Sequence, residues 1–210
     1  MYKESKSFQL SKPKGDIRSP RVSYLPSGGF VVVWTEWSAG GSLQCCVYSG
    51  EGVALGEPFQ VARSKVEIYA PCISYLPSGG FVVAWRQTCH SGYSLQCCVY
   101  SGDGIALGEP FQINRSSGSI FDPRVCILPS GGFVVVWTEW HDGGSIQCCV
   151  YSGDGIAVGE PFQVARSKVE IYDPCINVLP SGGFFVSWLQ RDDGINSLQC
   201  RRYSYIGESE

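Results

Sequence analysis

Apolar runs recur four times along the chain, each directly after a Pro-Ser-Gly-Gly segment and each closed by Trp. Three of the four runs contain no polar residue, whereas a strand with one solvated face alternates apolar and polar residues. The Pro-Ser-Gly-Gly segment favours a tight turn. The pattern therefore predicts a turn followed by a strand that is buried on both faces. These segments are residues 25–34, 76–85, 128–137 and 179–188.

The four runs belong to a longer repeat. The prolines that precede them, Pro20, Pro71, Pro123 and Pro174, are spaced by 51, 52 and 51 residues. Such a period is typical of propellers and solenoid arrays. Each unit contains four short extended segments separated by turns, and no ten-residue stretch shows helical periodicity free of Gly and Pro. We therefore predict an all-β chain of four-stranded units.

The ends of the chain predict how the units are joined. Phe8-Gln9-Leu10 matches the last strand of each earlier unit, as in Phe59-Gln60-Val61, whereas the fourth unit stops before its own copy. A closed ring uses such an offset to leave no open sheet edge. We therefore predict a single domain, residues 1–210, with the fold of a four-bladed β-propeller. Its blades are residues 20–63, 71–115, 123–166 and 174–205, the last completed by the N-terminal strand 8–12.

A second period lies over the first. Units one and three share Trp-Thr-Glu-Trp, at residues 34–37 and 137–140, while units two and four are entered by Ser-Lys-Val-Glu-Ile-Tyr, at residues 64–69 and 167–172. The ring should therefore have approximate twofold symmetry.

Composition and charge exclude several classes of partner. The chain has 16 Lys and Arg against 19 Asp and Glu, a net charge of −3 and a pI of about 5.4. It lacks the basic patch that nucleic-acid binding needs. The N-terminal residues lack the apolar core of a signal peptide, and the apolar runs are shorter than a membrane span. We expect a cytoplasmic protein that binds neither nucleic acid nor membrane. An extracellular location would require processing or non-classical export.

The cysteines do not form a familiar framework. There are 11 of them and no Cys-x-x-Cys. Six form adjacent pairs inside expected strands, where neighbouring side chains point to opposite faces and cannot easily bridge each other or bind one metal ion. We interpret them as small buried hydrophobic residues, with inter-strand disulfides or a metal site as the alternatives. The pairs are Cys45-Cys46, Cys97-Cys98 and Cys148-Cys149.

The unit resembles a known class of repeat. Its Leu-Pro-x-Gly-Gly-Phe-Val-Val-x-Trp strand, Gly-x-Gly hairpin and Gly-Glu-Pro-Phe-Gln-Val strand resemble the repeats, roughly fifty residues long, of secreted bacterial adhesin-like and hemolysin-type calcium-binding proteins. They are more loosely similar to the propeller repeats of integrin α-chains and some lectins. The resemblance covers nearly the whole chain and implies a propeller-type framework without fixing a function.

The chain departs from the calcium-binding pattern of those repeats. Ser27 and its equivalents occupy the first turn, where the bacterial repeats often carry Asp. Each second turn has one carboxylate, at Glu51, Asp103 or Asp154, whereas a calcium site needs about six oxygen ligands. We therefore interpret these acidic residues as turn formers.

Candidate binding residues gather on one expected face of the disc. The loops between second and third strands and the connections between units should share this face, and they hold nearly all the divergence between units. Trp37 and Trp140 end equivalent strands there, where an indole ring can stack on a sugar or anchor a protein contact. The alternatives are that both Trp pack under their own loops and that the Lys/Glu segments are solvated strand sides. The candidate ligand-binding residues are Trp37, Trp140, Tyr69, Tyr172, Lys65, Lys168, Glu67, Glu170, His90 and His141.

No catalytic arrangement is recognisable in the sequence. Neither His90 nor His141 has a nucleophile or carboxylate at a familiar spacing, and Asp192-Asp193 is typical of a solvated turn. We predict a non-catalytic binding module, lectin-like or protein-binding, without cofactor or metal and with a carbohydrate or protein partner. The alternative is a structural subunit that assembles into a homo-oligomer or polymer by strand exchange or face-to-face contacts.

Overall fold

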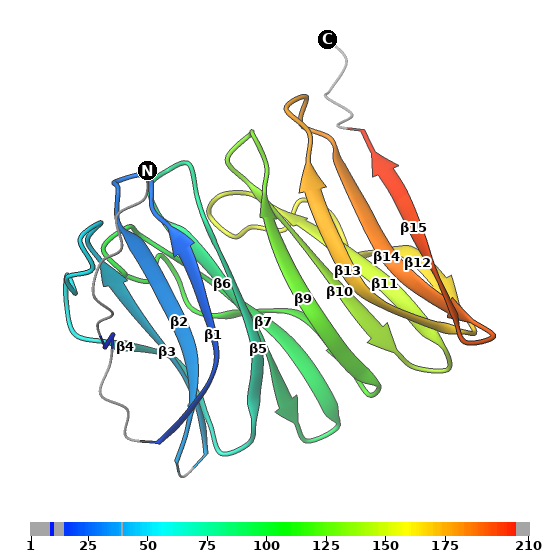
Figure 1. Cartoon of the computed structure of the whole chain (residues 1–210), viewed down its shortest axis with the longest axis horizontal. Coiled ribbons are helices and arrows are strands. Elements are labelled where there is room, and N and C mark those ends of the chain that lie inside the picture. The colour runs from blue at the N-terminus through cyan, green and yellow to red at the C-terminus, as the bar shows by residue number, and fades with distance from the viewer. Residues whose placement is uncertain (1–8, 11–14, 39, 205–210) are drawn as a thin grey trace.

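The computed structural model describes residues 9–10, 15–38 and 40–204 (Figure 1). These residues form fifteen β-strands and no helix, which confirms the all-β prediction. The strands build four antiparallel sheets, one for each repeat, which stand side by side in chain order. No helix of the described residues is long and apolar enough to cross a membrane.

Each of the first three sheets has four strands in sequence order, and the described part of the fourth has three. The first sheet contains β1 (Asp16–Tyr24), β2 (Phe30–Trp37), β3 (Gly41–Tyr48) and β4 (Phe59–Ser64). The second contains β5 (Ile68–Tyr75), β6 (Phe81–Cys89), β7 (Gly92–Tyr100) and β8 (Phe111–Ser116). The third contains β9 (Ser119–Ile127), β10 (Phe133–Trp140), β11 (Gly144–Tyr151) and β12 (Phe162–Ser167). The fourth contains β13 (Glu170–Val178), β14 (Phe184–Asp192) and β15 (Ile195–Tyr203).

The first strand of every sheet begins before the proline at which the predicted blade starts. The residue ahead of each proline has a positive φ, and the pairing register with the next strand shifts there. This bulge lets the strand pair on both sides of a residue that has no N–H to donate. Sequence patterns do not predict it, because a residue before proline normally avoids that conformation. The residues are Ser19 (51°), Ala70 (43°), Asp122 (48°) and Asp173 (52°).

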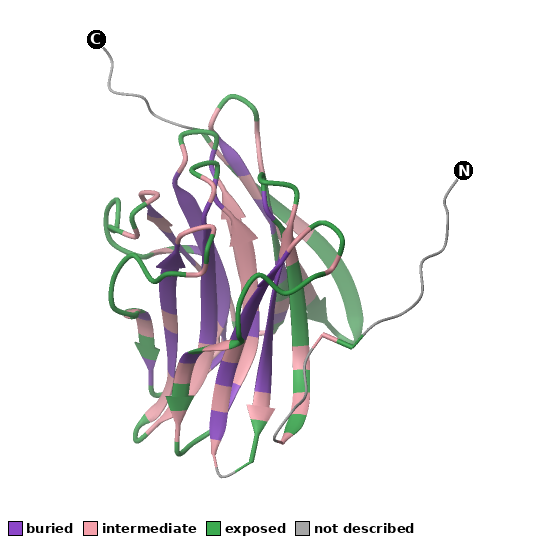
Figure 2. Ribbon diagram, turned by 90° about the vertical axis from the view of Figure 1, so that its left-hand side faces the viewer, coloured by how far each residue is buried: buried purple, intermediate pink, exposed green. Residues whose placement is uncertain are grey.

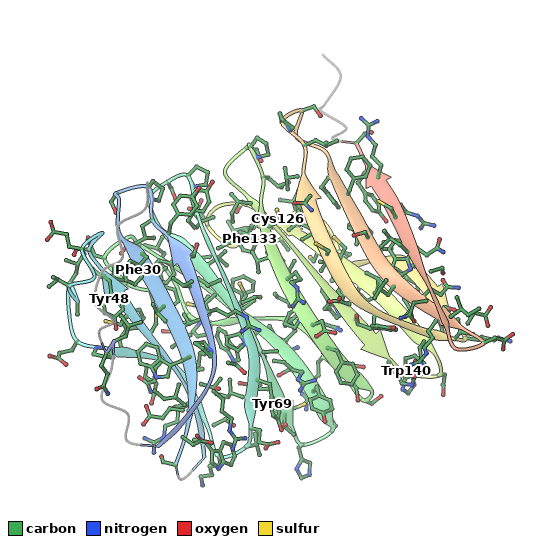
Figure 3. All side chains as sticks on the ribbon, viewed as in Figure 1. Phe30, Tyr48, Tyr69, Cys126, Phe133 and Trp140 are labelled. Carbon is green, nitrogen blue, oxygen red and sulfur yellow. The ribbon has the colours of Figure 1, made fainter. Side chains whose placement is uncertain are left out.

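The hydrophobic core lies between successive sheets, and the loops carry most of the exposed residues (Figure 2). Neighbouring side chains of one strand pack on opposite faces of the sheet. Cys45 lies on the face of the first sheet that packs on the second sheet, whereas Cys46 lies on the other face of the first sheet. The prediction that adjacent Cys point to opposite faces is therefore confirmed, and all the cysteines are free thiols in this structure. Stacked Phe-Tyr pairs recur in each sheet, such as Phe30–Tyr48 with ring centroids 5.1 Å apart (Figure 3).

The predicted ring closure is not what the structure shows. The first sheet packs on the second, the second on the third and the third on the fourth. The first and fourth sheets stand at opposite ends of the row (Figure 1). Leu10 packs against the first sheet, where the Tyr48 hydroxyl donates a hydrogen bond of 2.7 Å to its carbonyl oxygen. Gln9 and Leu10 are not in a strand, and Phe8 lies outside the described residues. Leu10 thus lies on an apolar face of the first sheet, and neither Gln9 nor Leu10 pairs with the fourth sheet.

Candidate functional site

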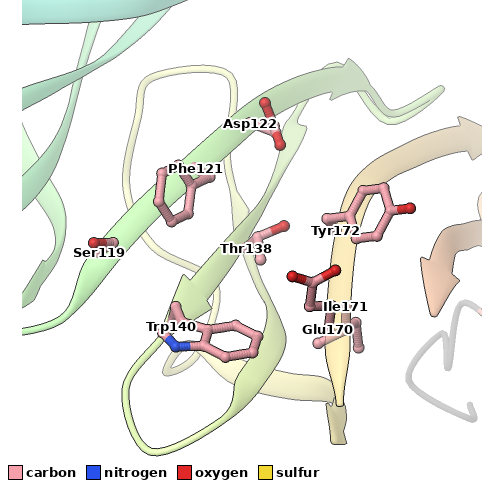
Figure 4. Close-up of a pocket in the computed structure, with 8 residues that line it drawn as sticks. All are labelled: Ser119, Phe121, Asp122, Thr138, Trp140, Glu170, Ile171 and Tyr172. Atoms are coloured by element: carbon pink, nitrogen blue, oxygen red, sulfur yellow. The ribbon is translucent and has the colours of Figure 1, made fainter. Parts of the chain in front are cut away.

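A pocket of about 490 Å³ opens between the third and fourth sheets (Figure 4). Phe121 and Trp140 come from the third sheet and Tyr172 from β13 of the fourth, with Thr138 between them. We call it the Trp140 pocket. Its lining residues are Ser119, Phe121, Asp122, Thr138, Trp140, Glu170, Ile171 and Tyr172.

Trp140 is held by its place at the end of β10. It pairs with Ser119 on one side and with Gly144 on the other. A Cβ atom on Gly144 would lie 3.0 Å from Cζ3 of Trp140 and 2.1 Å from Cγ2 of Ile171. Only glycine therefore lets the indole ring and Ile171 pack this closely over β11. The Trp140 residue remains 38% exposed, which leaves part of the ring free for a ligand.

The polar groups of the Trp140 pocket differ in whether they have a hydrogen-bond or ion-pair partner. The Tyr172 hydroxyl donates a hydrogen bond of 2.8 Å to Oδ1 of Asn196, and Glu170 lies 3.7 Å from the Arg191 guanidinium. Thr138 is 2% exposed, and its hydroxyl has no hydrogen-bond partner in the structure. A buried hydroxyl without a partner is costly, and Thr138 is the residue of this pocket that carries such a group.

The equivalent junction between the first and second sheets carries a smaller hollow of about 50 Å³. Trp37, Glu67 and Tyr69 line it, as Trp140, Glu170 and Tyr172 line the Trp140 pocket. We call it the Trp37 hollow. Arg18 and Ser19 replace Phe121 and Asp122 there.

The structure brings together six of the ten predicted binding residues, in two groups of three. The other four lie outside both the Trp140 pocket and the Trp37 hollow. Lys65, Lys168 and His90 are exposed, and the imidazole Nε2 of His141 lies 3.6 Å from the Asp142 carboxylate in an exposed turn. Among the residues that the structure describes, no group of three or more His, Cys, Asp or Glu is placed to hold a metal ion.

Sequence reasoning missed five residues that line the Trp140 pocket: Ser119, Phe121, Asp122, Thr138 and Ile171. A signal for Phe121 was present, because Ser-Ile-Phe-Asp-Pro at residues 119–123 aligns with Glu-Ile-Tyr-Asp-Pro at residues 170–174. Phe121 therefore occupies the same aromatic position as Tyr69 and Tyr172. No comparable signal marked Thr138, whose role depends on an unpaired hydroxyl that only the structure reveals.

Several solved structures of other proteins have a fold similar to that of this chain. An endo-arabinase from Bacteroides thetaiotaomicron has 13% sequence identity and a TM-score of 0.57, with 94% of this chain and 78% of that chain covered. An α-L-arabinofuranosidase from Podospora anserina, in complex with cellotriose, has 15% identity and a TM-score of 0.51, covering 94% and 69%. A xylan β-1,4-xylosidase from Bacillus halodurans has 16% identity and a TM-score of 0.51, covering 91% and 40%. The likeness shows an all-β, propeller-like fold.

The comparisons with protein-family models and with curated proteins find no match. The resemblance to adhesin-like and calcium-binding repeats therefore stays a prediction.

The comparisons correct the prediction that the chain is not an enzyme. Structures that share its fold include an endo-arabinase, a xylosidase and a sialidase. The prediction rested on the lack of a familiar motif around the two histidines and on the solvated turn at Asp192-Asp193. It did not consider Asp122 and Glu170 as a pair, and both line the Trp140 pocket.

Proposed function

We propose that the Trp140 pocket binds a carbohydrate. The observation that carries the proposal is the pairing of partly exposed aromatic rings with an unpartnered buried hydroxyl in one pocket. Sugars present apolar C–H faces that stack on aromatic rings, and hydroxyl groups that need hydrogen-bond partners. Trp140 and Phe121 supply the rings, and Thr138, Asp122 and Glu170 supply the polar groups.

The size of the Trp140 pocket supports the proposal. A volume of about 490 Å³ lies within the range of small-ligand sites, roughly 300–1,000 Å³. The endo-arabinase, the xylosidase and the structure with cellotriose suggest which sugars to test first.

Binding of a glycan panel to the protein and to a Trp140→Ala variant tests the proposal. We expect mono- and disaccharides to bind, and Trp140→Ala to weaken that binding about tenfold or more, because a stacked aromatic ring at the centre of a site is often a dominant contact. For mono- and disaccharides, Trp37→Ala is the matched control, since Trp37 has the same place in the repeat and the same 38% exposure but lies at another junction. The proposal fails if no glycan binds or if Trp140→Ala binds as well as the parent.

Cleavage of the bound glycan is a second candidate function, favoured by the two carboxylates in the Trp140 pocket. Most glycoside hydrolases use a pair of Asp or Glu residues, one as acid and the other as base or nucleophile. If Asp122 and Glu170 act in this way, arabinan or xylan should release new reducing ends. Asp122→Asn and Glu170→Gln should each abolish the release while the variants still bind the glycan. Release by either variant at the parent rate would exclude that residue from the chemistry.

A further inference from the structure

Three successive junctions between sheets place equivalent residues on the same face of the molecule. In each of the first three sheets, the first strand pairs with the second strand at an equivalent position just before the bulge. The three pairs are Arg18 with Thr35, Tyr69 with Arg86, and Phe121 with Thr138. The first strands β1, β5, β9 and β13 are neighbours in space. The positions therefore form a row, continued on β13 by Tyr172.

The middle junction differs because Arg86 stands where the other two have threonine. Its guanidinium carbon lies 4.6 Å from the ring centroid of Tyr69, 5.0 Å from that of Tyr93 and 5.3 Å from that of Phe121. The same group donates a hydrogen bond to the carbonyl oxygen of Ile120. Burial lowers the pKa of Arg86 below its ordinary value. Held between rings on several sides, the planar guanidinium fills the space that Thr138 leaves open at the third junction.

Phe121 connects this filled junction to the Trp140 pocket. Its ring contacts Arg86 and also lines the pocket, and the residue is 42% exposed. Tyr69 likewise contacts Arg86 and also lines the Trp37 hollow. Phe121, Arg86 and Tyr69 thus connect the Trp140 pocket to the Trp37 hollow. Figure 3 places Tyr69 and Trp140 at the same edge of the molecule.

The Trp37 hollow is too small to hold a ligand by itself. Its volume of about 50 Å³ is far below the roughly 300 Å³ of a small-ligand site. A contact at Trp37 would therefore add affinity only to a ligand already held elsewhere, because the second contact is then made at a high effective concentration.

We propose that the ligand is a linear sugar chain that occupies the Trp140 pocket and extends over Phe121, Arg86 and Tyr69 toward Trp37, which rests on carbohydrate binding at that pocket. Flat aromatic surfaces suit successive sugar rings, and the stacked Arg86 keeps Tyr69 and Phe121 in fixed positions. The Trp140 pocket sets which sugar unit is recognised, and the row of rings favours chains over single sugars.

Titration with arabino-, xylo- and cello-oligosaccharides of increasing length, from single sugars to chains long enough to reach Trp37, tests this inference. For the series that binds, we expect the longest chain to bind at least about tenfold more tightly than the disaccharide. Trp37→Ala should remove most of that gain and leave disaccharide binding unchanged. Trp140→Ala should weaken binding at every length. Leu107→Ala is the control, because Leu107 is 59% exposed in the loop that follows β7, at the other end of the second sheet.

The outcomes separate this inference from the proposed function. If binding depends on Trp140 but is equally tight for all lengths, or if Trp37→Ala leaves binding of the longest chain unchanged, the extended chain is ruled out and the Trp140 pocket stands. If no sugar of any length binds, both proposals are overturned. Melting temperatures of the Trp variants, which replace partly exposed side chains, should remain close to that of the parent, so that loss of binding is not loss of folding.

Discussion

Two threonines at the same position of the repeat have different hydrogen bonds. The Thr35 hydroxyl donates a bond of 2.9 Å to the carbonyl oxygen of Arg18, whereas the Thr138 hydroxyl has no partner in the structure. Both residues are buried, at 8% and 2% exposure. The sequence around both is Trp-Thr-Glu-Trp, and each threonine pairs with the equivalent residue of the first strand of its own sheet, so neither the local motif nor the strand pairing accounts for the difference.

Replacement of each threonine by valine tests this difference, because valine has nearly the same shape without the hydroxyl. Thr35→Val should lower the free energy of unfolding by about 1 kcal/mol, since a net hydrogen bond is lost. Thr138→Val should leave that free energy unchanged or raise it, since no bond is lost and a buried polar group is removed. Chemical denaturation measures both. An equal loss in the two variants would mean that the Thr138 hydroxyl is already satisfied in the free protein.

At the scale of the element, the sequence predicts the strands well and their ends less well. Alternating burial follows from the two-residue period of a strand, and so the opposite faces of Cys45 and Cys46 could be predicted. The bulges at Ala70 and its equivalents could not, because a positive φ at a non-glycine residue before proline is imposed by the neighbouring strands. As a result, β5 and its equivalents start earlier than predicted and carry Tyr69 and Tyr172 into the sheets.

Buried thiols within these strands should make stability depend on pH. Burial raises the pKa of the Cys72 thiol from 9.0 to about 12, and it also raises the pKa values of Cys45, Cys97 and Cys148. Above pH 9 the unfolded chain loses these protons while the folded chain keeps them, so the unfolded state is favoured. The free energy of unfolding should therefore fall as pH rises above about 9, by up to about 1.4 kcal/mol per pH unit for each such thiol.

Denaturation at several pH values between 8 and 11 measures this effect. Cys72→Ala should make the decline shallower, whereas Cys175→Ser, at an exposed position, should not. A flat profile up to pH 11 would contradict the assignment of these cysteines as buried, protonated thiols.

At the scale of the whole molecule, the sequence correctly predicts four successive sheets, but the prediction that they close into a ring was wrong. Because the units repeat, each sheet is expected to pack on the next through equivalent residues, and the structure confirms this. Closure depends on the angle between neighbouring sheets, and periodicity carries no information about that angle. The row of residues that contains Arg86 illustrates the same limit, since Arg86 breaks the pattern at one junction and only the packing shows that it fills the space.

Leu43 and Leu198 provide a test of the open arrangement, because they occupy the same position in the third strand of their sheets. Leu43 on β3 is 0% exposed beneath the second sheet, whereas Leu198 on β15 is 74% exposed. Leu43→Ala should therefore lower the free energy of unfolding by about 2–5 kcal/mol, the usual cost of a cavity in a core. Leu198→Ala should change it by no more than about 0.5 kcal/mol, as for other surface positions.

The free energy of unfolding of the Leu198→Ala variant should also be measured at several protein concentrations. A large loss of stability that is independent of concentration would mean that the first and fourth sheets meet within one molecule in solution, as the closed ring requires. A loss that appears only at high concentration would mean that a second copy covers β15, because association stabilises the folded state by mass action. Self-assembly, the alternative function inferred from the sequence, would then become the better account of this edge. A small change at every concentration is the result expected from the exposed position of Leu198.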